Sequence, residues 1–213
     1  VAPSAIPFKE TDQASIALDA SGIAKLINDF ALATKRALNA GFQVLEIHAA
    51  HGYLLHEFLS PLCNIRSDEY GGSFENRIRF LLETVRAVRE VWDERLPLTA
   101  RISGTDWVDG GWSVDDSVQL ARQLKAEGVD LIDCSSGGGV AQAKVPAGPS
   151  YQVPISEAVR HGADIPTATV GLVTAPEQAD EIIRNGRADL VLLGREMLRD
   201  PYWALHAAQV LKQ

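Results

Sequence analysis

Two histidines and a tyrosine lie in the short run HAAHGY at positions 48–53. His48 ends an apolar segment that is typical of a strand, and His51 and Tyr53 follow on the loop beyond it. Imidazole N–H groups can donate hydrogen bonds to an oxygen that gains negative charge, and a phenol can deliver a proton. His48 and His51 could equally be polar residues with ordinary structural hydrogen bonds.

A zinc site is a second interpretation of this region, because His56 follows closely and could join His48 and His51 as a ligand. The spacing matches none of the usual zinc motifs, and we expect no metal. The two cysteines, Cys63 and Cys134, lie far apart and form no CxxC pair. The sequence therefore predicts neither a disulfide framework nor an iron–sulfur cluster, and it favours a cytoplasmic protein.

Helical and strand-like segments alternate along the chain after an irregular start of about twenty residues. Short apolar runs predict strands at 43–48, 98–103, 129–134, 167–170 and 190–193. Helical spacing predicts helices beginning at Ser21, Asn76, Ser113, Pro154, Thr174 and Asp200, with a capping box formed by Thr174 and Glu177. Residues 49–75 are predicted to be a long polar loop.

This alternation predicts an α/β fold with a buried parallel sheet, in a single domain that spans residues 1–213. A doubly wound sheet should carry a phosphate-binding GxGxxG or GxxxxGK[ST] motif, and neither occurs. Polar residues and glycines instead follow every predicted strand, as in a TIM (β/α)8 barrel. Five strands cannot close such a barrel, so we expect the chain to be part of a larger one.

Two glycines and two arginines are candidates for an anion site. Gly171 and the pair Gly194-Arg195 follow the last two predicted strands, where TIM barrels often bind phosphate. Alternatively, the glycines serve only tight turns and Arg195 pairs with Glu196 or Asp200. Arg101, inside an apolar strand, needs a polar partner, which could be a bound ring or anion or a carboxylate such as Glu46.

The overall charge restricts the possible partners. The net charge of −8 and the pI of about 5.1 argue against nucleic acid and against anionic membranes, since both require a basic surface. No apolar run is long enough to cross a bilayer. The chain begins with Val1 rather than methionine, so we expect further residues upstream.

Several segments together resemble the Old Yellow Enzyme family, in particular its bacterial branch of thermophilic-type ene-reductases and xenobiotic reductases. The most specific is HAAHGYLLHEFLSPLCNIRSDEYGGSFENRIRFLLE at 48–83, and others are LTARIS, GVDLIDCSSG and ADLVLLGREMLRDPYW. The opening VAPSAIPF is similar to the family's connection after its third barrel strand. The resemblance therefore implies that this chain supplies strands four to eight of the barrel.

The resemblance also implies a role for each candidate residue. His48 and His51 would bind the carbonyl oxygen of an enone-type substrate, and Tyr53 would protonate its α-carbon. Arg101 would lie at the edge of the flavin ring of FMN, with His48 also in contact with the cofactor. Gly171, Gly194 and Arg195 would bind the FMN phosphate. NADPH or NADH would be the hydride donor.

The chain departs from the family pattern in two ways. It lacks the first three strands with their flavin contacts, for which Cys63 and Cys134 are no substitute, and it lacks the C-terminal tail that reaches a neighbouring subunit. The full-length protein is expected to be a homo-oligomer, whereas this chain alone should bind FMN poorly. A non-catalytic half-barrel and a metal-dependent hydrolase are the alternative functions.

Overall fold

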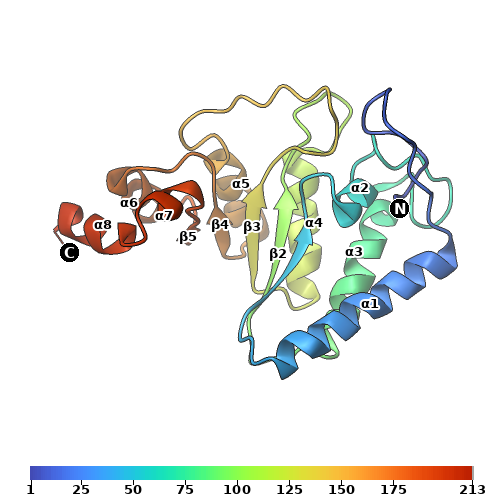
Figure 1. Cartoon of the computed structure of the whole chain (residues 1–213), viewed down its shortest axis with the longest axis horizontal. Helices are drawn as coiled ribbons and strands as arrows, with labels where there is room; N and C mark the ends of the chain where they lie inside the picture. Colours follow the sequence, from blue (N-terminus) through green and yellow to red (C-terminus); the bar gives the residue numbers. More distant parts are fainter. Residues whose placement is uncertain (213) are drawn as a thin grey trace.

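The computed structural model describes residues 1–212 and contains one parallel sheet (Figure 1). Its five strands are β1 (Leu45–Ala49), β2 (Leu98–Ser103), β3 (Leu131–Ser135), β4 (Thr167–Thr169) and β5 (Leu190–Val191). They pair in chain order, and every pairing is parallel. This order has no reversal point, so it excludes a doubly wound sheet and agrees with the predicted barrel. Among the described residues, β1 and β5 remain the two edges.

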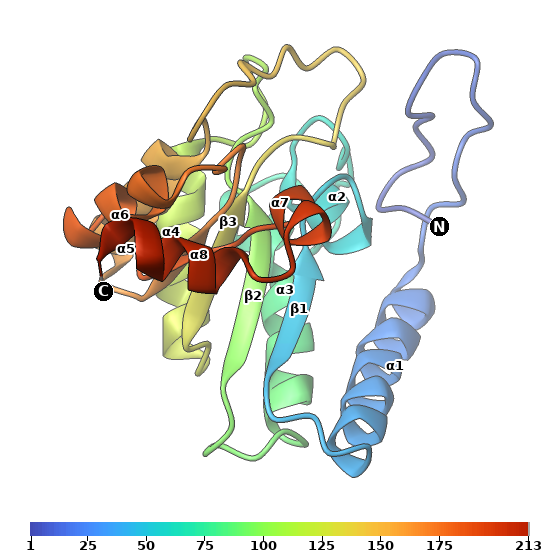
Figure 2. The same cartoon turned by 60° about the vertical axis from the view of Figure 1, so that its left-hand side comes forward.

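Helices connect successive strands, as parallel pairing requires. The connecting helices are α2 (Leu54–Leu59), α3 (Phe74–Arg89), α4 (Val114–Ala126), α5 (Val153–Ala163) and α6 (Pro176–Arg184). Helix α1 (Ala20–Asn39) precedes β1, and α7 (Arg195–Arg199) and α8 (Trp203–Leu211) follow β5. The strands point toward the same end of the sheet, and the long loop between β3 and α5 crosses that end (Figure 1). Figure 2 shows α1 as a long helix at one side of the molecule, and its contacts are with α3.

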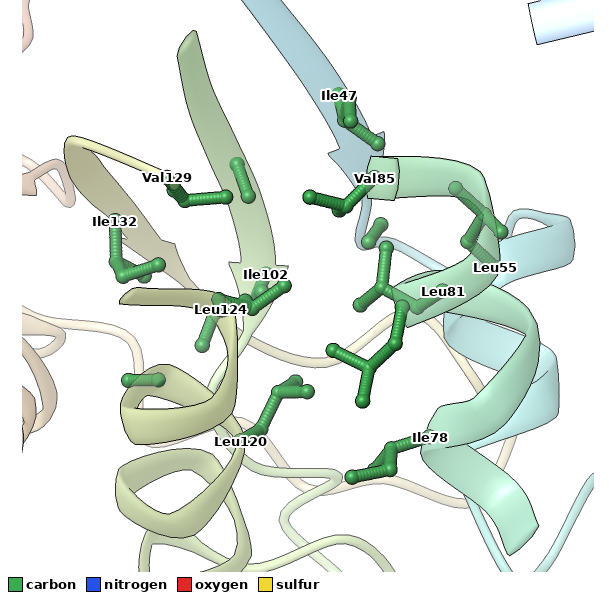
Figure 3. Close-up of a cluster of buried hydrophobic side chains, with 14 of the residues drawn as sticks. Ile47, Leu55, Ile78, Leu81, Val85, Ile102, Leu120, Leu124, Val129 and Ile132 are labelled. Carbon is green, nitrogen blue, oxygen red and sulfur yellow. The ribbon is translucent and has the colours of Figure 1, made fainter. Parts of the chain in front are cut away.

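The sheet separates an apolar face from a polar one, because successive side chains of a strand point to opposite faces. Ile47, Ile102 and Ile132 point toward the helices, where they meet Leu81 and Val85 of α3 and Leu120 and Leu124 of α4 (Figure 3). Most of these side chains are completely buried. The residues that alternate with them lie on the opposite face of the sheet.

That opposite face carries a row of polar residues held by the register of the strands. His48 is opposite Arg101 on β2, and Arg101 is opposite Asp133 on β3. Neighbouring parallel strands lie about 4.8 Å apart, so these three side chains start from adjacent points of the sheet. The apolar packing behind the sheet therefore fixes the positions of the polar row in front of it.

Several predicted helix starts are wrong in detail. The N-cap of α1 is Asp19, whose carboxylate accepts hydrogen bonds from Gly22 N and from the hydroxyl of Ser21, the predicted cap. The predicted capping box of α6 does not form, because Pro176 occupies the first turn and Ala175 is the N-cap. Thr174 N instead donates to the Gln178 side chain.

The predicted start of the last helix at Asp200 is also wrong. The Asp200 carboxylate accepts from Tyr202 N and contacts His206, and α8 begins only at Trp203. The short helices α2 and α7 were not predicted, and α2 lies inside the segment predicted to be loop. The predicted cap at Ser113 is confirmed, because its hydroxyl and Asp116 form a reciprocal capping box.

We predict that Leu81→Ala lowers the free energy of unfolding by about 2–5 kcal/mol, because it leaves a cavity in the core behind β2. Leu81 is completely buried, whereas Leu32 on α1 is 46% exposed. Leu32→Ala is the matched control and should change stability by no more than about 0.5 kcal/mol. Urea denaturation of both variants measures the difference, and equal losses would contradict this assignment of the core.

Candidate active site

His48, His51 and Tyr53 form one cluster at the carboxyl end of β1. The ring centroids of His48 and His51 are 5.2 Å apart, and those of His48 and Tyr53 are 5.4 Å apart. The two imidazoles are partly buried, whereas the Tyr53 side chain is 65% exposed. The structure thus brings together the two imidazoles and the phenol that the sequence singled out.

The turn that carries this cluster has an unusual backbone. His51 and Gly52 both have positive φ angles, of 61° and 74°. A positive φ at a residue other than glycine costs about 1–3 kcal/mol, so the surrounding structure must hold it. A Cβ atom on Gly52 would lie only 2.1 Å from the carbonyl oxygen of Gly138, which means that no other residue fits there.

A serine on the neighbouring strand helps to hold this turn. His51 N donates to the Ser103 hydroxyl over 2.9 Å, and that hydroxyl donates to the carbonyl oxygen of Gly137 over 2.7 Å. The glycine run 137–139 is therefore packed against the His51 turn. This contact makes the glycine run part of the structure that surrounds the histidine cluster.

The His51 ring is oriented by a second chain of hydrogen bonds. Its Nε2 lies 2.7 Å from Ser135 Oγ at the end of β3, and Ser135 also lies 3.3 Å from Gln152 Oε1. The Gln152 amide is itself oriented, because its Nε2 donates to the carbonyl oxygen of Val170. Neither Ser135 nor Gln152 was predicted, since only the folded chain reveals these contacts.

The surroundings of both imidazoles disfavour their protonated forms. Burial, followed by the positive charge of Arg101, lowers the pKa of His51 from 6.5 to about 4. The same two causes lower the pKa of His48. Both rings are therefore neutral near pH 7, and each has one N–H group to donate.

Arg101 is held by a carboxylate that the sequence analysis did not identify. Its Nε lies 3.1 Å from Asp133 Oδ2, and not beside Glu46, whose carboxylate accepts from Thr99. Asp133 is only 1% exposed, and burial, opposed by Arg101, raises its pKa to about 7. The alignment of the pair is imperfect, and neither Arg101 Nε nor the Asp133 oxygens have another hydrogen-bond partner among residues 1–212.

A cavity of about 530 Å³ lies beside this cluster, at the ends of β3, β4 and β5. Its walls include four residues that the sequence predicted to bind a cofactor, namely Arg101, Gly171, Gly194 and Arg195. Ser135 also lines it, and the hydrogen bond to His51 therefore connects the cavity with the histidine cluster. All the predicted site residues consequently belong to one continuous region.

Two features of the cavity suit an anionic ligand. Gly171 has a φ of 126°, and a Cβ atom there would press on Gln152 and Tyr151 at 3.0 Å. Arg195 has no carboxylate within ion-pair distance in the part of the chain that the structure describes, because Glu196 pairs with Arg199 and Asp200 with His206. The alternative pairing of Arg195 with Glu196 or Asp200 is therefore wrong.

His56, the third ligand in the zinc interpretation, lies beside an aspartate and not beside His48 and His51. His56 is completely buried, and its Nε2 approaches Asp106 rather than the other two imidazoles. Across residues 1–212, no set of three His, Cys, Asp or Glu side chains is arranged around a common metal position.

None of the described helices has both the length and the apolar composition needed to cross a bilayer.

We predict that the His51 ring titrates near pH 4 in a histidine NMR experiment. Because its folded pKa lies below the ordinary value of 6.5, the unfolded chain binds this proton more tightly. The contribution of His51 to stability is thus complete above about pH 6.5 and falls as the pH drops toward 4. A midpoint at or above 6.5 would contradict the burial and charge described for the ring.

Comparison with known proteins places the chain in a family. A family model described as "NADH:flavin oxidoreductase / NADH oxidase family" matches residues 2–213. The chain is 54% identical over 211 residues to an NADPH dehydrogenase of Geobacillus sp. (strain WCH70). The aligned region covers 99% of this chain and 61% of that relative.

Solved structures agree with this match. The old yellow enzyme homologue from Zymomonas mobilis superposes with a TM-score of 0.79 at 26% identity, over 99% of this chain and 61% of that one. Morphinone reductase in complex with tetrahydroNAD gives a TM-score of 0.78 at 26% identity, over 97% of this chain and 60% of that one.

The chain thus spans about three fifths of these relatives, and its five strands are part of the predicted (β/α)8 barrel. The chain belongs to the NADH:flavin oxidoreductase / NADH oxidase family, which confirms the resemblance to Old Yellow Enzymes.

Proposed function

We propose that this chain is the C-terminal part of a flavin-dependent oxidoreductase that uses FMN and NADPH or NADH to reduce the activated C=C bond of α,β-unsaturated carbonyl compounds. One observation carries the proposal. His48, His51 and Tyr53 form a cluster that is joined through Ser135 to a cavity lined by Arg101 and Arg195. The names of its relatives, NADPH dehydrogenase and morphinone reductase, support this reaction class.

The residues of the cavity fit FMN. Arg101 lines the cavity and its side chain is 26% exposed, so its guanidinium can offer N–H groups to a polar group of a ligand while its buried Nε faces Asp133. Arg195 can bind a phosphate bidentately, and the absence of a side chain at Gly171 and Gly194 leaves room for close approach of the ligand. Bound there, FMN would supply the transfer of hydride between the nicotinamide and the substrate.

The histidine cluster would act on the substrate directly. With the Ser135 hydroxyl donating to His51 Nε2, the His51 ring would carry its proton on Nδ1. This N–H group and that of the neutral His48 ring would donate hydrogen bonds to the carbonyl oxygen, which polarises the enone and stabilises the negative charge that develops on this oxygen. Tyr53 would give its phenolic proton to the α-carbon while the β-carbon receives the hydride. Ser135 and Gln152 would keep the His51 ring in its orientation.

Arg101 would act through its charge. Its guanidinium would lie beside the flavin ring, where a cation stabilises the negative charge of the reduced form. Asp133 fixes the direction of this guanidinium, but it also brings an acidic group whose pKa is raised to about 7. Together they would set the local charge at the cofactor.

The protein is proposed to be cytoplasmic and to form a homo-oligomer. Both cysteines are free thiols, which supports a reducing compartment such as the cytoplasm. Chromatographic sizing of the full-length protein would test the proposed homo-oligomer. The same preparation, compared with this 213-residue chain alone, would show whether the chain is instead a non-catalytic half-barrel that needs its missing part.

We predict that the full-length protein is yellow, is bleached by NADPH or NADH, and is reoxidised by 2-cyclohexenone. His51→Ala should lower kcat about 10²–10³-fold through loss of an oxyanion donor, and Tyr53→Phe about 10²-fold through loss of the proton donor. His161→Ala is the control, since His161 is exposed on α5 and far from the cluster in the fold. A colourless protein that takes up no FMN would rule out the function.

We also predict that Arg195→Ala weakens FMN binding about tenfold to a hundredfold, as expected for loss of a charged hydrogen-bonding group. Arg184→Ala is the matched control, because Arg184 lies on α6 and pairs with Asp180 rather than lining the cavity. The quenching of FMN fluorescence on titration with each apoprotein gives the two dissociation constants. Equal constants for both variants would remove Arg195 from the cofactor site.

A further inference from the structure

A buried histidine–aspartate pair lies directly beneath the turn that carries His51 and Tyr53. His56 comes from α2 and Asp106 from the loop after β2, and both side chains are completely inaccessible to solvent. Burying two ionisable groups is costly unless each one is satisfied by its surroundings. The proposed reaction gives neither residue a task, so their purpose has to be found in their contacts.

The contacts of His56 determine where its ring carries a proton. The backbone N–H of Gly52 donates to His56 Nδ1 over 2.9 Å. A backbone amide can only donate, so Nδ1 is an acceptor and the ring proton is on Nε2. Nε2 lies 3.2 Å from Asp106 Oδ1, within ion-pair distance, and neither atom has any other polar partner among the described residues.

Asp106 is held firmly on its other side. Its Oδ2 accepts hydrogen bonds from the Ser60 hydroxyl over 2.6 Å and from Trp112 N over 2.8 Å. Burial opposes ionisation of Asp106, but His56 and these two donors outweigh it and lower the pKa of the carboxyl group. The carboxylate therefore has one orientation, with Oδ1 toward the imidazole.

The pair is also in contact with the glycine run that covers the turn. A Cβ atom on Gly139 would lie 3.0 Å from His56 Cε1 and 3.2 Å from Asp106 Oδ1. One residue earlier, a Cβ atom on Gly138 would lie 2.6 Å from the His51 backbone. The turn is thus enclosed between the glycine run and the His56 ring, and it has little freedom to move as long as Gly52 keeps its acceptor.

We propose that His56 and Asp106 are positioning residues: Asp106 keeps the proton of His56 on Nε2, which leaves Nδ1 to hold Gly52 N–H and so fixes His51 and Tyr53 over the substrate. This inference rests on the proposed function for its catalytic consequence, but not for its structural part. A displacement of about 1 Å in such a turn is enough to lower a rate about 10²-fold.

Asp106→Asn tests the proton assignment with little change in shape. Ser60 and Trp112 both donate, so they would bind the carbonyl oxygen of the new amide and turn its NH₂ group toward His56. The imidazole would then accept at Nε2 and carry its proton on Nδ1, where it opposes Gly52 N–H. ¹⁵N NMR of labelled histidine reports this change, and amide hydrogen exchange at Gly52 should become faster.

Two substitutions of His56 separate its two contacts. In His56→Asn, the amide oxygen can take the place of Nδ1 and accept from Gly52, but the side chain is too short for Asp106. In His56→Gln, the amide nitrogen can reach Asp106, but nothing replaces the acceptor for Gly52. A purely structural role predicts that activity follows thermal stability in both variants.

The decisive experiment measures kcat/KM for 2-cyclohexenone, the melting temperature and Gly52 exchange in the full-length, FMN-loaded protein. We expect Asp106→Asn and His56→Gln to lose about tenfold to a hundredfold in kcat/KM. We expect His56→Asn to stay within about threefold even where it melts lower than His56→Gln. Asp189→Asn, which loses an ion pair with Arg160 away from the turn, is the control and should match the wild type.

Activity losses that simply follow the melting temperatures would overturn the proposal, and so would unchanged Gly52 exchange in Asp106→Asn. If the wild-type protein binds no FMN and reduces no enone, the proposed function fails. The histidine tautomer and the Gly52 exchange would still decide whether the pair holds the turn.

Discussion

The register of three parallel strands is the constraint on which the site depends. It places His48, Arg101 and Asp133 side by side on one face of the sheet. The residues that alternate with them, such as Ile47 and Ile102, are buried against α3 and α4. A slip of one residue would exchange the two faces and move polar groups into the core, so the hydrophobic packing itself keeps the polar row in place.

The turn after β1 adds a second constraint, since its positive φ angles are not favourable by themselves. Hydrogen bonds from three directions hold it: Ser103 accepts from the His51 backbone, Ser135 contacts the His51 ring, and His56 accepts from Gly52. These partners are polar and mostly buried, and they belong to β2, β3 and α2. The position of His51 and Tyr53 therefore depends on the assembly of several elements and not on the turn alone.

Much of the fold could be predicted from local patterns. The strand 98–103 has the predicted bounds, and the cap at Ser113 is where its side chain and spacing indicated. The errors at Asp19 and Pro176 arose because several polar residues compete near a helix start, and the sequence does not show which of them reaches a free N–H group. The six-residue helix α2 has too few positions for a periodic pattern to be visible.

The candidate site was predictable in its residue types but not in its supporting contacts. His48, His51 and Tyr53 were visible because they lie close together in the chain. Ser135 is 84 residues from His51, and Asp106 is 50 positions after His56 in the chain, so only folding brings these pairs into contact. Asp133 could have been singled out, because an acidic residue inside an apolar strand needs a polar partner, but the sequence did not identify Arg101 as that partner.

The most direct test of the central claim is a crystal structure of the full-length protein with FMN and an unreactive analogue of an enone. The account predicts the analogue's carbonyl oxygen within about 2.7–3.2 Å of nitrogen atoms of both His48 and His51. It also predicts the flavin beside Arg101 and its phosphate on Arg195. A cofactor bound elsewhere, or a carbonyl group that points away from both imidazoles, would contradict it.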